Sequence, residues 1–159
     1  MKVVVETNVT IAANGRNTHA SLACQYNCVE FLEKLVSTQS RDQVLLDDRG
    51  LILNEYKRYL NYRGQPGTGD IFFKVLHDNM HWGNRVKQIS VTPVTDEDKG
   101  FGELPVNQVD KSDRKFLAVA CVGKGHVINA VDTDWHEQAA FITGLCVSVK
   151  QLCPEHGCP

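Results

Sequence analysis

Carboxylates at two helix positions are the residues of this sequence that most suggest chemistry. Phe116, Leu117 and Ala120 lie three, four and seven residues after Asp113, so on a helix Asp113 shares their apolar face. An acid on a buried face must be paired, hydrogen-bonded or bound to a metal ion. Because Asp113 falls in the first turn of the expected helix, a role in capping that helix is the alternative.

Glu55 occupies a similar position in another expected helix. Two apolar residues precede it by four and three positions, and Tyr59 follows it by four. Glu55 therefore also points along an apolar stripe. A nearby cation, Arg58 or Lys57, is the alternative explanation for an acid in this place.

Further acids follow the expected strands directly. Apolar runs at 2–6, 43–46 and 126–131 have the length of strands, and the first does not alternate, as is typical of a strand buried on both faces. Helices between parallel strands bring the carboxyl ends of the strands to one edge, where open α/β sheets bind ligands. The acids expected at that edge are Glu6, Asp47, Asp48, Asp132 and Asp134.

Carboxylates gathered in this way repel one another unless cations lie between them. Because the donors are all oxygens, Mg²⁺ or Mn²⁺ is the expected cofactor rather than zinc. Such ions activate water and stabilise a leaving oxygen, which is the chemistry of phosphodiester cleavage. The set of acids therefore predicts a metal-dependent phosphodiesterase.

The elements that position these acids alternate along the chain. Apolar patterns also predict strands over 86–94 and 145–152, and helices over 19–36, 51–60, 70–82, 112–122 and 135–143. Ser112 is the expected N-cap of the helix that contains Asp113, and residues 95–108 are expected to form an exposed loop. In the helix over 19–36 the expected apolar face consists of Leu22, Tyr26, Val29, Leu32 and Val36. The expected fold is α/β, a three-layer α/β/α Rossmann-like domain with a central, mainly parallel sheet that spans residues 1–159.

Composition narrows the class of protein. The chain has 159 residues, of which 42% are hydrophobic and 23% charged, and its formal net charge is −2. Any affinity for nucleic acid must therefore come from a local patch rather than from bulk charge. No apolar run approaches the roughly 20 residues that a membrane helix needs, and the apolar run at the N-terminus is too brief for a signal peptide. A cytoplasmic protein with no membrane partner is expected.

Six cysteines raise the question of disulfides and zinc. Cys24, Cys28 and Cys121 fall within apolar helical patterns, and nothing in the sequence indicates secretion, so reduced thiols are expected. A zinc site in the C-terminal segment is the alternative, although that segment lacks a paired CxxC. The residues that would form it are Cys146, Cys153, His156 and Cys158.

Nearly the whole chain resembles the PIN-domain ribonucleases. VVVETNV (3–9) resembles the family's first strand and its acid, LILNEYKRYL (51–60) the segment with its glutamate, DRKFLAVA (113–120) its Asp-led helix, and VINAVDTDW (127–135) its strand and paired acids. The resemblance implies a PIN-type fold and metal-dependent cleavage of RNA, with Glu6, Glu55, Asp113 and Asp132 as catalytic metal ligands and Asp134 as a further ligand. Two positions depart from the family. Its first acid is usually aspartate, where this chain has Glu6, and Ala130 and Val131 replace the usual threonine before the fourth acid.

Four residues beside the acids are candidates for contact with RNA: Asn8, Lys111, Arg114 and His136. For Asn8, orientation of Glu6 or of a metal-bound water through its amide and an Asx turn at the strand end are the two interpretations. For Lys111 and Arg114, a solvated helix face is the alternative to phosphate contact. An RNA-processing role or that of a toxin with an antitoxin partner fits this activity, as does a homo-oligomer.

Three functions other than RNA cleavage are alternatives for this sequence. A phosphohydrolase acting on small phosphoesters would need the spacing DxDx[TV] after the first strand, which is absent. A catalytically degenerate PIN-like domain that binds RNA or a protein partner is the non-enzymatic alternative, and the glutamate at position 6 favours it. Catalysis by a Cys/His pair is disfavoured because no cysteine lies beside an expected base in a loop.

Overall fold

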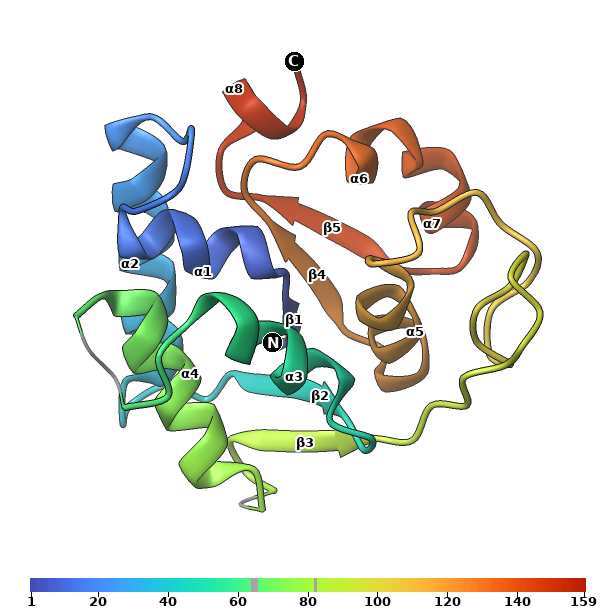
Figure 1. Ribbon diagram of the computed structural model, residues 1–159, viewed down its shortest axis with the longest axis horizontal. Coiled ribbons are helices and arrows are strands. Elements are labelled where there is room, and N and C mark those ends of the chain that lie inside the picture. The colour runs from blue at the N-terminus through green and yellow to red at the C-terminus, as the bar shows by residue number, and fades with distance from the viewer. Residues whose placement is uncertain (64–65, 82) are drawn as a thin grey trace.

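The centre of the molecule is a five-stranded sheet in which every pairing is parallel. A computed structural model describes residues 1–63, 66–81 and 83–159. The strand order is β3-β2-β1-β4-β5 (Figure 1). The strands are β1 (Lys2–Val5), β2 (Gln43–Asp47), β3 (Val86–Ile89), β4 (His126–Asn129) and β5 (Ser148–Gln151). The α/β class and the parallel sheet are thus as expected from the sequence.

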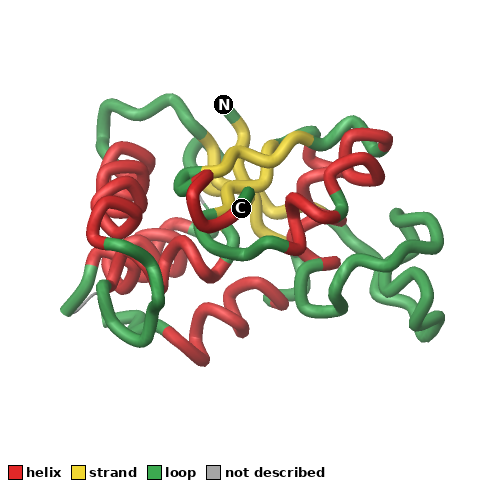
Figure 2. Tube along the Cα trace, turned by 90° about the horizontal axis from the view of Figure 1, so that it is seen from above, coloured by secondary structure: helices red, strands yellow, loops and turns green. Residues whose placement is uncertain are grey.

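Helices flank this sheet. They are α1 (Thr7–Asn14), α2 (Leu22–Val36), α3 (Leu51–Tyr59), α4 (Thr68–Asn79), α5 (Arg114–Gly123), α6 (Asp134–Glu137), α7 (Ala139–Gly144) and α8 (Pro154–Gly157). Helices α1, α2 and α4 pack against one another, whereas α5 packs against β1, β2, β3 and β4. Viewed from above, helices lie on both sides of the strands (Figure 2).

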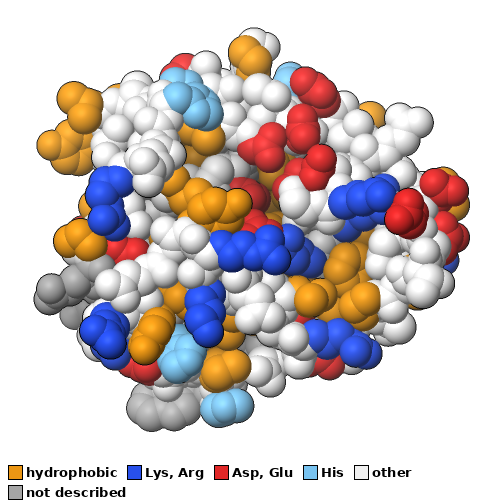
Figure 3. Space-filling view, in the orientation of Figure 1, with side chains coloured by type: hydrophobic (Ala, Val, Ile, Leu, Met, Phe, Trp, Pro, Cys, Tyr) orange, Lys and Arg blue, Asp and Glu red, His pale blue; other side chains and the backbone are white. Residues whose placement is uncertain are grey.

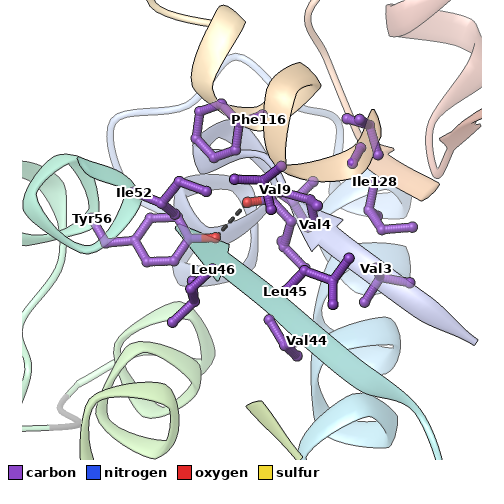
Figure 4. Close-up of a cluster of buried hydrophobic side chains, with 14 of the residues drawn as sticks. Val3, Val4, Val9, Val44, Leu45, Leu46, Ile52, Tyr56, Phe116 and Ile128 are labelled. Atoms are coloured by element: carbon purple, nitrogen blue, oxygen red, sulfur yellow. Dashed lines mark hydrogen bonds between the residues drawn. The ribbon is translucent and has the colours of Figure 1, made fainter. Parts of the chain in front are cut away.

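The core lies between the sheet and these helices. Valines of β1, branched side chains of β2, and Ile128 of β4 pack against Ile52, Tyr56 and Phe116 from the helices (Figure 4). The hydroxyl of Tyr56 donates a hydrogen bond to the backbone oxygen of Val5. This contact ties α3 to the end of β1, where Glu6 follows. Gly123 lets α5 lie close to β2, because an added Cβ would come within 2.5 Å of the Leu45 side chain.

Several local expectations need correction. Helix α2 begins after the N-cap Ser21 and buries Cys24, Cys28, Leu32 and Leu35, whereas Leu22 and Tyr26 are exposed. The apolar face predicted for it was therefore rotated. Helix α1 and helix α8 were not predicted, and α6 and α7 replace one expected helix. The expected helix over 70–82 begins at Thr68 and ends at Asn79; Trp82 lies outside the described residues.

The start of α5 also differs from the expectation. Its N-cap is Asp113, not Ser112, and Asp113 makes no side-chain capping hydrogen bond. The hydroxyl of Ser112 instead donates to Oδ1 of Asp110 at 2.6 Å. The Asp113 carboxylate is therefore not occupied by capping.

The prediction that all the cysteines are free thiols is wrong. Cys24 of α2 and Cys153, which precedes α8, form a disulfide with their Cα atoms 5.4 Å apart. Cys28, Cys121, Cys146 and Cys158 are free. Among the described residues no helix has the length and apolar character required to cross a bilayer.

Candidate metal centre

Three of the predicted acids meet at the edge of the sheet where β4 ends. Asp113 lies at the start of α5, Asp132 lies between β4 and α6, and Asp134 is the first residue of α6. One carboxylate oxygen from each lies within 4.8 Å of the others. Oδ1 of Asp132 also accepts a hydrogen bond from the backbone N–H of Asp134 at 2.9 Å, which fixes the turn between them. This spacing allows the three carboxylates to share one cation.

Glu6 reaches the same edge from the end of β1. It is the N-cap of α1, and its Oε2 accepts a hydrogen bond from the backbone N–H of Asn8 at 2.6 Å. Its side chain is buried, and burial raises the pKa of Glu6 to about 8 although the Asn8 hydrogen bond lowers it. Repulsion from Asp113, Glu55 and Asp132 raises this pKa further. The shared repulsion places these acids within one electrostatic cluster.

Glu55 enters the cluster from α3. Its Oε1 accepts a hydrogen bond from the hydroxyl of Thr7, and its Oε2 forms an ion pair with the ammonium of Lys115 on α5. Both charged side chains are largely buried, at 14% and 12% exposed. The partner of Glu55 is therefore not Arg58 or Lys57, the two cations that the sequence offered.

The aspartates of the cluster also have perturbed acidities. Burial raises the pKa of Asp113 to about 7, and repulsion from Asp132, Asp110 and Asp134 adds to the effect. The pKa of Asp132 is raised as well, chiefly by burial. Burial is the larger cause of both shifts, and repulsion between the carboxylates is the smaller one. A bound cation would relieve the repulsive part.

The surface around the cluster has a clear pattern of charge. Acidic side chains form a band that runs into a hollow, and lysine and arginine side chains border it (Figure 3). An anionic polymer could approach the acidic hollow along such a basic border. The overall net charge of −2 does not reveal this local arrangement.

The raised acidities predict how stability depends on pH in the metal-free chain. The pKa values of Glu6, about 8, and Asp113, about 7, lie above those of an unfolded chain, so the folded chain binds more protons. Their contribution to stability is complete below the unfolded values and is lost as pH rises through about 7 and 8. We expect the melting temperature in chelator to fall by roughly 5–10 °C between pH 6 and pH 8.5.

Differential scanning calorimetry in buffered chelator measures this dependence. Glu6→Gln is the matched variant, because it keeps the size of the side chain but has no proton to lose. It should flatten the pH dependence. A melting temperature of the wild type that rises with pH over this interval would contradict the assignment of the two pKa shifts.

Asn8 positions the end of β4 in this structure. Its Oδ1 accepts hydrogen bonds from the backbone N–H groups of Ala130 at 3.0 Å and Val131 at 3.3 Å, and its Nδ2 donates to Oδ1 of Asn129 at 2.8 Å. The backbone N–H of Asn8, not its side-chain amide, donates the hydrogen bond that orients Glu6. Asn8 therefore links the segment after Glu6 to the segment before Asp132, rather than presenting its amide to a substrate.

Removal of this link should destabilise the chain. We expect Asn8→Ala to lower the free energy of unfolding by about 1–3 kcal/mol, because two part-buried backbone donors lose their acceptor. Denaturant unfolding measures the change. Asn54→Ala on the exposed side of α3 is the matched control, since no side-chain hydrogen bond involves it in the described structure. Equal stabilities of the two variants would exclude this role for Asn8.

Arg114 and Lys111, two further predicted substrate contacts, differ in their exposure to solvent. Arg114 is buried, and its guanidinium donates to the backbone oxygens of Val109, Glu97 and Asn107. Phosphate contact by Arg114 was a wrong prediction, because this side chain holds the 95–108 loop. That loop is accordingly not fully exposed, since Leu104 is 1% exposed. Lys111 is exposed and forms an ion pair with Glu97 at 3.2 Å, and its contact with phosphate remains a prediction.

His136 lies on the exposed side of α6. It lines a cavity of about 340 Å³ together with Trp135, Thr143 and Ser148 among others. The Asp113, Asp132 and Asp134 carboxylates do not line this cavity. A role for His136 in contacting RNA remains a prediction.

Two acids expected at the site have structural roles instead. The carboxylate of Asp47 accepts hydrogen bonds from the backbone N–H groups of Arg49, Leu51 and Ile52, so it holds the start of α3. Asp48 accepts one from the backbone N–H of Val91 at 3.3 Å. A strand-end position therefore does not by itself mark a metal ligand.

Sequence reasoning overlooked two residues. Lys115 was not expected to pair with an acid of the site, yet its ammonium forms an ion pair with Glu55. Asp70 is fully buried and receives hydrogen bonds from Asn14, Arg16 and the backbone N–H groups of Asn61 and Gly67. Arg16 forms an ion pair with Asp70 at 3.0 Å. A buried acid at the start of a helix was the signal that could have identified Asp70.

Comparison with protein-family models, with curated proteins and with solved structures gave no match to this chain. The donor set nevertheless fits a divalent cation. The clustered side chains offer carboxylate oxygens, which Mg²⁺ and Mn²⁺ prefer, and repulsion between these carboxylates contributes to their raised pKa values.

Proposed function

We propose that this chain is a metal-dependent endoribonuclease that uses the acidic cluster, as the resemblance to PIN-domain ribonucleases implies. The observation that carries the proposal is the convergence of acids from four separate segments. Asp113, Asp132 and Asp134 lie within 4.8 Å of one another, and Glu6 and Glu55 adjoin them. In the described part of the chain, Lys115 is the cation that forms an ion pair with this set.

The proposal assigns two tasks to the acids. Asp113, Asp132 and Asp134 hold a divalent cation, and Glu6 and Glu55 extend the ligand set on the side of β1 and α3. Bound Mg²⁺ or Mn²⁺ supplies an activated water and stabilisation of the leaving oxygen. Lys115 orients Glu55 and limits repulsion inside the cluster before the cation enters. Lys111, exposed at the rim, is placed to contact a phosphate of the RNA.

Cleavage of a labelled RNA tests the proposal directly. The purified chain is incubated with an end-labelled single-stranded RNA and with a hairpin RNA, in Mg²⁺, in Mn²⁺ and in chelator. Internal cleavage in the divalent cations and none in chelator is expected. Incubation with a single-stranded DNA of the same sequence reports whether cleavage depends on the sugar of the nucleic acid. Absence of cleavage of every RNA in both cations would reject the enzymatic proposal.

The non-enzymatic alternative has one specific observation in its favour. Glu6 replaces the family's usual aspartate and uses its carboxylate oxygen to cap α1. A degenerate domain that binds RNA or a protein partner would retain RNA binding without turnover. Binding of the labelled RNA that is measured without cleavage in either cation would favour this alternative. The proposed activity itself is compatible with an RNA-processing enzyme and with a toxin controlled by an antitoxin.

A further inference from the structure

Three buried cysteines form a cluster where the C-terminal segment crosses the beginning of α2. The Sγ atoms of Cys24, Cys28 and Cys153 lie within 4.8 Å of one another, and Cys24, Cys28 and Cys153 are each 0% exposed. Cys24 and Cys28 are one helical turn apart on α2, and Cys153 immediately precedes α8. The disulfide uses two of the three sulfurs, so it does not account for the third.

A histidine lies at the edge of this cluster, on the side of Cys24. Ligand atoms of His156, Glu155 and Cys24 lie within 4.8 Å of one another. Nε2 of His156 accepts a hydrogen bond from the backbone N–H of Ser21, with a separation of 3.0 Å. A neutral imidazole that accepts at Nε2 carries its proton on Nδ1. Nε2 is thus unprotonated, and it becomes a metal ligand when it exchanges the hydrogen bond from Ser21 for the ion.

Other contacts hold the two segments together. Nδ2 of Asn27 donates a hydrogen bond to the backbone oxygen of Leu152 with a separation of 3.1 Å. Sγ of Cys153 lies 3.6 Å from the backbone oxygen of Cys24. Figure 1 shows α8 at the same end of the molecule as the beginning of α2. The cysteine cluster is thus built by contacts on both sides of it rather than by the disulfide alone.

We propose that in the reduced chain Cys24, Cys28, Cys153 and His156 bind one Zn²⁺ ion, which anchors the C-terminal segment to α2. Three thiolates and one imidazole are a ligand set of structural zinc sites. Cys24 and Cys28 are separated by three residues, and Cys153 and His156 by two, which are short spacings of the kind found in paired zinc ligands. Glu155 is the competing fourth ligand, but zinc in structural sites prefers nitrogen and sulfur.

Zinc binding to the reduced chain requires two chemical steps, reduction of the disulfide and then deprotonation of the thiols. A thiol or phosphine reductant supplies two electrons, and two protons are taken up, so the disulfide becomes two thiols. Zn²⁺ then displaces one proton from each of the three cysteines. Burial raises the pKa of the Cys28 thiol to about 12, which opposes ionisation in the absence of metal. A coordinated thiol is deprotonated outright, so zinc removes this obstacle.

This zinc set differs from the one that the sequence suggested. Cys146 is exposed, and Cys158 lines the cavity next to Trp135 and His136. Cys24 and Cys28 replace them, although they are more than 120 residues away in sequence. The inference is independent of the acidic cluster, which offers only oxygen ligands.

Metal analysis of the reduced full-length chain tests the proposal. The chain is reduced with a phosphine, loaded with Zn²⁺ in excess Mg²⁺ to occupy oxygen sites, and desalted. One zinc per chain is expected. Replacement with Co²⁺ should give thiolate-to-cobalt charge-transfer absorption and tetrahedral ligand-field bands, which carboxylate ligands alone do not produce.

Matched variants identify the ligands. Cys28→Ser removes a proposed ligand but leaves both disulfide cysteines in place, and it should weaken zinc binding by at least about a hundredfold. His156→Ala should also weaken it, whereas Cys146→Ser and Glu155→Gln should not. Absence of zinc from the reduced wild type would overturn the proposal, as would unchanged zinc affinity in folded Cys28→Ser. If Cys28→Ser does not fold, the cobalt spectrum of the wild type still decides whether thiolates bind the metal.

Discussion

Asp113→Asn is expected to lower divalent-dependent RNA cleavage by a factor on the order of a thousand without unfolding the chain. The carboxylate of Asp113 lies within 4.8 Å of those of Asp132 and Asp134, so it is the ligand that joins α5 to the acids after β4. Asparagine retains the shape but removes the charge and one anionic donor. The remaining pair would hold a cation less firmly and in a different position.

The same substitution should stabilise the metal-free chain. Asp113 is 4% exposed and makes no capping hydrogen bond, so its charge has a cost in stability and no compensating role in α5. Removal of the charge relieves repulsion with Asp132, and we expect a rise of several degrees in the melting temperature at pH 8.5 in chelator. Calorimetry and labelled-RNA cleavage on the same preparation measure both effects.

Asp78→Asn is the matched control for this pair of measurements. Asp78 is an exposed aspartate on α4 that pairs with Lys74, and its replacement should change neither cleavage nor pH dependence appreciably. Full cleavage by a folded Asp113→Asn variant would exclude the acidic cluster as the catalytic site. That result would leave the zinc proposal untouched, since its ligands are cysteines and a histidine.

The arrangement of the sheet could be predicted because its signals are local. The valines of β1 and the apolar run of β2 do not alternate, and all three valines of β1 are 0% exposed in the structure. Helices between these runs imply parallel strands, and parallel strands place Glu6, Asp132 and Asp134 at one edge. The same argument also selected Asp47 wrongly, because it could not distinguish a metal ligand from the acceptor of three backbone N–H groups.

Periodicity was less reliable where two faces of a helix have similar apolar character. In α2 the apolar residues Leu22 and Tyr26 suggested the buried face, but Cys24 and Cys28 occupy it. Cysteine behaves as a small apolar residue, so the two faces had similar apolar character and tertiary contacts decided between them. The short α1 was overlooked because its sequence, TNVTIAAN, contains β-branched residues that favour strands.

Contacts between distant segments could not be predicted from one sequence. Lys115 meets Glu55 only because α5 and α3 pack side by side, and neither residue marks the other in the sequence. Arg114, one residue earlier, was taken to be a substrate contact and is instead directed into the 95–108 loop. Adjacent positions on a helix point about 100° apart, so a small error in the helix start exchanges their roles.

Lys115 helps the chain to remain folded around the acidic cluster when no metal ion is bound. Its ammonium is paired with Glu55 and is 12% exposed, so it offsets part of the negative charge inside the protein. Glu6 and Asp113 have no such partner, and it is their pKa values that are raised most, to about 8 and about 7. Burial is the main cause of both shifts, and repulsion among the acids adds to it. A divalent cation held by Asp113, Asp132 and Asp134 would reduce that repulsion.

Glu6→Asp is the substitution that distinguishes an active enzyme from a degenerate one. The backbone of Glu6 is fixed by β1 and by the start of α1, and its carboxylate both caps α1 and faces Asp113. Aspartate is a good N-cap residue, so the shorter side chain should retain the hydrogen bond from Asn8. Its carboxylate would however withdraw by about one methylene from the other acids.

If the surrounding residues are adapted to glutamate, this withdrawal should be harmful. A shift of about an ångström in a group that must be held in position can lower a rate on the order of a hundredfold, and we expect that loss of RNA cleavage together with weaker Mn²⁺ binding in Glu6→Asp. Glu6→Gln, which keeps the length but not the charge, should lose metal binding without regaining it at higher pH. Because the N-cap survives in Glu6→Asp, its melting temperature in chelator should remain close to that of the wild type. An inactive wild type that gains divalent-dependent cleavage on Glu6→Asp would contradict the proposed activity, because the family's usual ligand length would then be what the site lacks.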